Sequence, residues 1–172
     1  MPNWCSNTVN IAGEENEMNQ MKDLVQTKDS KFDFDAIDPM PEELKGIHSG
    51  STTIDGESFD LWREVDGENV GVTKAEIKAL EEKFGTASWY DWNCQHWGTK
   101  WNASDAYDSD AGDNITYGFD TAWAPPLPVL EKLSAKFPNL SIHIRYEEEG
   151  CGFWGEAVFK AGKQESSTEG DM

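Results

Sequence analysis

Residues 140–159, LSIHIRYEEEGCGFWGEAVF, are typical of two antiparallel strands joined by a tight turn. Apolar and polar side chains alternate on both sides of the glycine-containing segment 149–152, which predicts one buried and one exposed face. We expect Ile142, Ile144 and Tyr146 to point inward. The residues expected on the exposed face are His143, Arg145, Glu147, Trp154, Glu156 and Val158.

The rest of the chain supplies further strands and helices around this pair. Alternation predicts strands at 7–11, 32–37 and 114–119. Apolar residues at helical spacing predict helices from Glu14 to Val25, from Thr73 to Phe84 and after Pro126. This order favours an α+β fold, in which helices cover one face of a mostly antiparallel sheet and the other face is polar.

The length of 172 residues fits a single domain, which we place at 1–160. Residues 46–72 are rich in glycine, serine, threonine and acids, and we interpret them as a long inserted loop over the surface. Residues 161–172 are polar, and we expect a disordered acidic tail there.

The charge is strongly negative, with 33 acidic against 14 basic residues and a net charge of −19. Such a surface repels phosphate backbones, so we do not expect nucleic-acid binding, although a basic protein surface would be attracted. High solubility alone would also explain the charge.

Neither a secretory signal nor a membrane span is visible, and the cysteines are three in number and far apart. That spacing favours free thiols in a reducing compartment, which predicts a cytoplasmic location. The cysteines are Cys5, Cys94 and Cys151.

Five strings in this order resemble one known family: MPNWCSN at the start, FDFDAIDPMPEEL at 32–44, HWGTKWNA at 96–103, FDTAWAPP at 119–126 and YEEEGCGFWGE at 146–156. They are similar to the YubB-type ferredoxin-like family, uncharacterised proteins carried by plasmids, phages and other mobile elements. The resemblance covers most of residues 1–160. It implies a ferredoxin-like two-layer sandwich and an accessory role in a host cell, and it brings no catalytic residues.

Motifs for catalysis or cofactor binding are absent, so we expect no catalytic residue, metal or cofactor. No CxxC, HxxxH, GxGxxG or Walker sequence occurs. Cys94 and His96 could act as a nucleophile and its base only if the segment is extended, because in a helix they lie on different sides. The alternative is a buried thiol beside an ordinary histidine. Residues 147–149 could form a divalent-cation site or a solvated charge run at the hairpin tip.

The candidate binding residues are mainly aromatic. A first group lies beside tight turns, where the rings either form a recognition pocket or fix an irregular segment to the sheet edge; it comprises Trp97, Lys100, Trp101, Asp120 and Trp123. A second group is expected on the open sheet face, where aromatics stack bases in some RNA-binding folds; it comprises Trp4, His143, Arg145 and Trp154.

These features support three hypotheses. The first is a non-enzymatic accessory protein of a mobile element that binds a host or defence protein through its acidic surface or an aromatic patch. One version of this hypothesis is that the acidic surface imitates the charge of nucleic acid. The second is an enzyme or small-ligand binder that uses the tryptophan-rich pocket of residues 97–101 and Trp123. The third is a single-stranded nucleic-acid binder that uses the open sheet face.

Overall fold

The computed structural model describes residues 2–172, and they divide into two compact units. The first unit contains the chain up to Pro39 together with His96–Met172, and the second contains Met40–Gln95. The prediction of one domain over 1–160 therefore needs correction, because the middle of the chain forms a separate set of contacts. No helix within residues 2–172 is long and apolar enough to cross a membrane.

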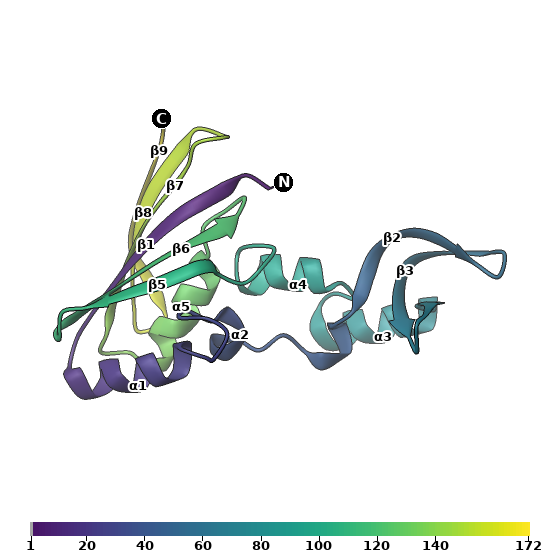
Figure 1. Cartoon of the computed structure of the whole chain (residues 1–172), viewed down its shortest axis with the longest axis horizontal. Helices are drawn as coiled ribbons and strands as arrows, with labels where there is room; N and C mark the ends of the chain where they lie inside the picture. The colour runs from purple at the N-terminus through teal and green to yellow at the C-terminus, as the bar shows by residue number, and fades with distance from the viewer. Residues whose placement is uncertain (1) are drawn as a thin grey trace. The chain divides into compact units, whose positions relative to one another are not determined.

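The first unit is built on a six-stranded antiparallel sheet in the order β5-β6-β1-β7-β8-β9 (Figure 1). Its strands are β1 (Trp4–Ala12), β5 (Ser104–Asp110), β6 (Asn114–Ala122), β7 (Ser141–Glu148), β8 (Phe153–Lys160) and β9 (Lys163–Asp171). Its helices are α1 (Glu15–Val25), α2 (Phe34–Ile37) and α5 (Leu127–Lys136), while α4 (Trp89–His96) ends where this unit resumes.

The connections in this unit define its fold. When the elements between α1 and β5 are left aside, β1, α1, β5, β6, α5 and β7 form a βαββαβ unit, and their strands lie in the order β5-β6-β1-β7. This is the ferredoxin-like arrangement, and β8 and β9 extend it at the β7 edge. The α+β two-layer sandwich predicted from the sequence is therefore confirmed.

The core lies between one face of the sheet and the helices. Along β1, Cys5, Val9 and Ile11 are buried, whereas Ser6 and Thr8 between them are exposed. The same alternation runs through β7, as the sequence predicts. Helices α1 and α5 lie on the same side of the sheet (Figure 1) and bury their apolar residues: Met18, Met21, Val25, Val129, Leu130 and Leu133.

An aromatic cluster fills the core beneath β6. Phe32 stacks on Phe119 with ring centroids 5.1 Å apart and lies 4.8 Å from Tyr117. Phe34 meets Phe119 edge-on at 5.7 Å. The strand predicted at 32–37 is wrong, because Phe34–Ile37 is helical and the Asp33 carboxylate accepts a hydrogen bond from the Asp35 backbone N–H at its start.

The second unit contains η1 (Glu42–Leu44), α3 (Lys74–Phe84) and a three-stranded antiparallel sheet of β2 (Ile47–Ile54), β3 (Glu57–Val65) and β4 (Glu68–Gly71). The long inserted loop predicted at 46–72 is therefore wrong. Asp-Gly pairs at 55–56 and 66–67 have positive φ at both residues, which is the geometry of two-residue hairpin turns. Thr73 and Glu76 form a capping box at the start of α3, where the sequence predicts a helix to begin.

The disordered tail predicted at 161–172 is also wrong. Residues Lys163–Asp171 form β9, which pairs with β8 along most of its length. Tyr146 donates a hydrogen bond from its hydroxyl to Glu169 Oε1 at 2.8 Å. Main-chain hydrogen bonds do not depend on side-chain polarity, so a polar segment can still add an edge strand.

Deleting residues 161–172 should lower the free energy of unfolding by about 1–3 kcal/mol, because the hydrogen bonds to β8 and the Tyr146–Glu169 bond are lost. The measurement is urea denaturation followed by circular dichroism. Glu165→Gln, which changes a charge on β9 but keeps the strand, should unfold like the parent. An unchanged midpoint after the deletion would show that β9 contributes nothing to stability.

Candidate functional site on the open sheet face

The face of the six-stranded sheet opposite α1 and α5, which we call the open face, carries polar side chains in rows across the strands. One row joins Asp120, Ser6, Glu147 and Trp154 on β6, β1, β7 and β8. In the next row, Arg145 lies between Thr8 and Glu156. The outward orientation predicted for alternate residues of β7 and β8 agrees with their exposure, since the intervening residues are buried.

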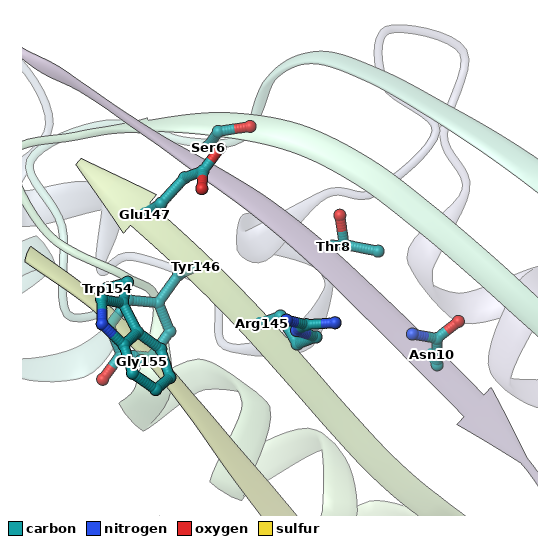
Figure 2. A pocket seen from close by; sticks show the side chains of 8 residues that line it. All are labelled: Ser6, Thr8, Asn10, Arg145, Tyr146, Glu147, Trp154 and Gly155. Atoms are coloured by element: carbon teal, nitrogen blue, oxygen red, sulfur yellow. The ribbon is translucent and has the colours of Figure 1, made fainter. Parts of the chain in front are cut away.

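Two concavities on the open face form what we call the open-face groove. The inner one has a volume of about 380 Å³ and is lined by Ser6, Thr8, Asn10, Arg145, Tyr146, Glu147, Trp154 and Gly155 (Figure 2). The outer one has a volume of about 490 Å³ and is lined by Asn3, Trp4, Ser6, Asp120, Glu147, Glu148, Glu149 and Gly150. Ser6 and Glu147 line both, so the two lie side by side.

Aromatic rings gather at the outer end of the groove, where β1 begins. Trp4 lies 6.3 Å from Trp101 between ring centroids, and the Lys100 ammonium lies 4.5 Å from the centre of the Trp101 ring. The Trp123 backbone N–H donates to the Asn3 carbonyl and so fixes the segment after β6 beside the start of β1. Trp4, Trp101, Trp123 and Trp154 are each between 37% and 49% exposed.

The structure places the candidate binding residues predicted from the sequence at different positions relative to the groove. Trp4, Asp120, Arg145 and Trp154 line the groove, and Lys100 and Trp101 lie at its outer end beside Trp4. His143 is on the open face, with its Nε2 3.5 Å from Glu156 Oε2.

Trp97 does not belong to a recognition pocket and is corrected to a core residue. Only 4% of its surface is exposed, and its Nε1 donates to the Asp38 carbonyl at 2.9 Å. His96 next to it has Nδ1 at 2.8 Å from both Asp38 Oδ2 and Lys132 Nζ, and Lys132 also pairs with Asp38. These contacts fix residues 96–97 to Asp38 after α2 and to Lys132 on α5, so Trp97 fixes an irregular segment of the chain.

Several groove residues were missed by the sequence analysis, among them Asn3, Ser6, Thr8 and Asn10. The signal for three of them was present, because Ser6, Thr8 and Asn10 alternate with the buried Cys5, Val9 and Ile11. Small polar residues on an exposed face look unremarkable until their neighbours across the sheet are known.

The hairpin tip after β7 is held by a buried carboxylate. Glu148 is only 1% exposed and accepts hydrogen bonds from the Gly150 and Cys151 backbone N–H groups, both at 2.7 Å. A hydrogen bond from the Cys151 thiol is the largest cause that lowers the pKa of Glu148, and the two backbone bonds add to it. Residues 147–149 are therefore not a fully solvated charge run. Nor do their three carboxylates face one another as ligands of one cation, because the Glu148 carboxylate is buried and accepts hydrogen bonds from the backbone of the turn.

The three cysteines are free thiols, as predicted. Burial raises the pKa of Cys5 to about 12, and the hydrogen bond to Glu148 raises the pKa of Cys151. Both groups are thereby kept as weakly nucleophilic thiols at neutral pH. Within residues 2–172 no three His, Cys, Asp or Glu side chains are arranged to hold a metal ion.

The fold and the groove place this unit among ferredoxin-like domains with an open sheet face. Residues 96–172 match the family model described as a ferredoxin-like domain in Api92-like protein. The whole chain is similar to the crystal structure of the protein api92 from Yersinia pseudotuberculosis, with a TM-score of 0.60 and 15% identity over 100% of this chain and 99% of that one. No curated protein matches the sequence. The more specific YubB-type resemblance stays a prediction.

Replacing Glu148 by Gln should destabilise the fold in a pH-dependent way. The pKa of Glu148 is lowered in the folded state, so its ionised form adds stability above about 4.5, the ordinary value. That contribution is lost as the pH falls through the lower folded pKa. Urea midpoints of the parent and the variant should therefore differ at pH 7 and converge below pH 4.5.

The matched control is Glu149→Gln, which neutralises the exposed neighbour of Glu148. Its midpoint should follow the parent at every pH. A gap between Glu148→Gln and the parent that stays constant down to the acid transition would contradict this role of Glu148.

Proposed function

We propose that this protein is a non-enzymatic binding module and that the outer end of the open-face groove recognises a basic segment of a partner protein. The observation that carries the proposal is the convergence of an exposed tryptophan and several carboxylates in one concavity. Trp4, Asp120, Glu147 and Glu149 all line it. Carboxylates attract cationic side chains, and the faces of indole rings bind them through cation–π contact.

The carboxylates at this end are not neutralised from within. Among the described residues 2–172, Asp120, Glu147 and Glu149 form no ion pair with a lysine or arginine. The net charge of −19 adds a long-range attraction for a basic partner and speeds its approach. A lysine or arginine of a partner would therefore find carboxylates that have no competing cation within the described chain.

The chain itself provides an example of the proposed contact. The Lys100 ammonium lies 4.5 Å from the centre of the Trp101 ring, and Trp101 in turn lies beside Trp4. This pair supports the view that the ring cluster is suited to cations. Trp and Arg or Lys contacts of this type are frequent at the centres of protein interfaces.

Several features favour binding over catalysis. Neither concavity of the groove is lined by a cysteine or a histidine, the side chains that most often act as nucleophile or general base. The hypothesis of a small-ligand pocket at residues 97–101 and Trp123 has less support, because Trp97 is buried and neither Trp101 nor Trp123 lines the groove. The acids along the groove likewise oppose a single-stranded nucleic acid.

The setting of the partner extends this proposal. The resemblance to mobile-element proteins makes a host or defence protein with a basic surface the natural partner, and the charge of −19 would let this chain compete there with nucleic acid.

The test is a selection of displayed random peptides on the immobilised full chain at 0.15 M salt. Enriched peptides should be rich in lysine and arginine. Their affinity should fall about tenfold or more for Asp120→Asn combined with Glu147→Gln, since each charge-assisted hydrogen bond contributes roughly 1.5–3 kcal/mol.

The matched control is Asp60→Asn combined with Glu81→Gln, which removes the same charges from the second unit. It should lower the affinity less than twofold. Selection of peptides without a basic bias, or equal losses in both double variants, would overturn the proposal.

A further inference from the structure

We infer that Arg145 forms an anion-binding site in the inner part of the open-face groove, suited to the carboxylate or phosphate group of a ligand with a flat apolar body. This inference goes beyond the proposed function and does not depend on it. It concerns the inner concavity, centred on Arg145, and not the acids at the outer end.

The charge of Arg145 is not neutralised within residues 2–172. The sequence has two arginines, and the other one, Arg63, pairs with Glu76 at 2.7 Å. The acid opposite Arg145 on β8 is Glu156, and its Oε2 lies 3.5 Å from His143 Nε2. In a chain with 33 acidic residues, an arginine left without a carboxylate partner in a concavity is available for an external anion.

Hydrogen-bond donors surround Arg145 on the side of β1. The Asn10 Oδ1 accepts a hydrogen bond from the Thr116 hydroxyl at 2.7 Å, which directs the Asn10 amide nitrogen away from β6. Figure 2 shows this nitrogen on the side facing Arg145, with Thr8 next to both. Two donor groups that face each other, with a hydroxyl that can also donate beside them, define a position for an oxyanion.

The shape and lining of the concavity indicate the rest of the ligand. The indole of Trp154 lies over Gly170, where a side chain would collide with it, and forms one wall of the concavity. Glu147 lies two residues from Arg145 along β7, about 7 Å away. Its carboxylate would repel a second anionic group on the ligand, so a ligand with one anionic group is favoured. A volume of about 380 Å³ holds a small molecule with one aromatic ring and one anionic group.

The two arginines make a direct experiment possible on the full chain. The side-chain Nε–Hε groups of Arg145 and Arg63 should give two cross-peaks in a nitrogen-15 NMR spectrum, assigned with Arg63→Lys. Phenyl phosphate, benzoate and inorganic phosphate are then titrated at constant ionic strength. The Arg145 cross-peak should shift with saturation, whereas the Arg63 cross-peak should stay fixed because Glu76 holds that guanidinium.

The three probes separate the features of the site. Phenyl phosphate or benzoate should bind at least threefold more tightly than inorganic phosphate if the Trp154 wall takes the ring. The tighter of these two shows whether the site prefers phosphate or carboxylate. Asn10→Asp places an acid diagonally across from Arg145, in the same concavity, and should weaken binding of the tighter probe about tenfold or more.

Two results would overturn the inference. One is that neither cross-peak moves, or that both move together without saturation, which indicates general screening of charge. The other is that Asn10→Asp, with an unchanged amide spectrum elsewhere, binds the probes as the parent does.

Discussion

The burial of one sheet face under α1 and α5 is the constraint on which the rest of this unit depends. A strand has only two faces, so each apolar residue sent to the helices sends its neighbours to the other side. Along β1 this places Val9 and Ile11 in the core and Thr8 and Asn10 in the groove. The core and the candidate site are therefore two consequences of one alternation.

This constraint explains why much of the fold could be predicted from the sequence. The hairpin of residues 140–159 alternates without interruption, and its orientation followed directly from the choice of the apolar face. The helix of Thr73–Phe84 carried its capping residues in the sequence. At 32–37 the alternation was misleading. Phe32, Phe34 and Ile37 are all buried, but the segment from Phe34 is a short helix, and over so few residues its pattern of apolar side chains resembles that of a strand.

The other errors arose where strands carry little apolar character. The sheet of β2, β3 and β4 and the edge strand β9 are made largely of exposed polar residues. Their order comes from main-chain pairing and from turns such as Asp55-Gly56, whose chemistry was a stronger guide than composition. The candidate site was predicted in part, since exposed tryptophans and Arg145 were identified, but Ser6, Thr8 and Asn10 gain meaning only from the register of β1 against β7.

The open face combines two chemistries that the net charge alone would hide. Its outer end presents carboxylates beside tryptophans, and its inner part presents an arginine beside amide and hydroxyl groups. In the binding role that we propose, such alternation of charge along one groove would select a partner rather than attract every basic surface.

The most direct measurement of the central claim is the thermal stability of two neighbouring variants, Thr8→Lys and Val9→Lys. The account predicts that lysine at the open-face position leaves the melting temperature nearly unchanged. Lysine at the buried position should unfold the domain, since an unpaired charge would enter the core. Equal effects of the two substitutions would contradict a sheet that is covered on one face and open on the other.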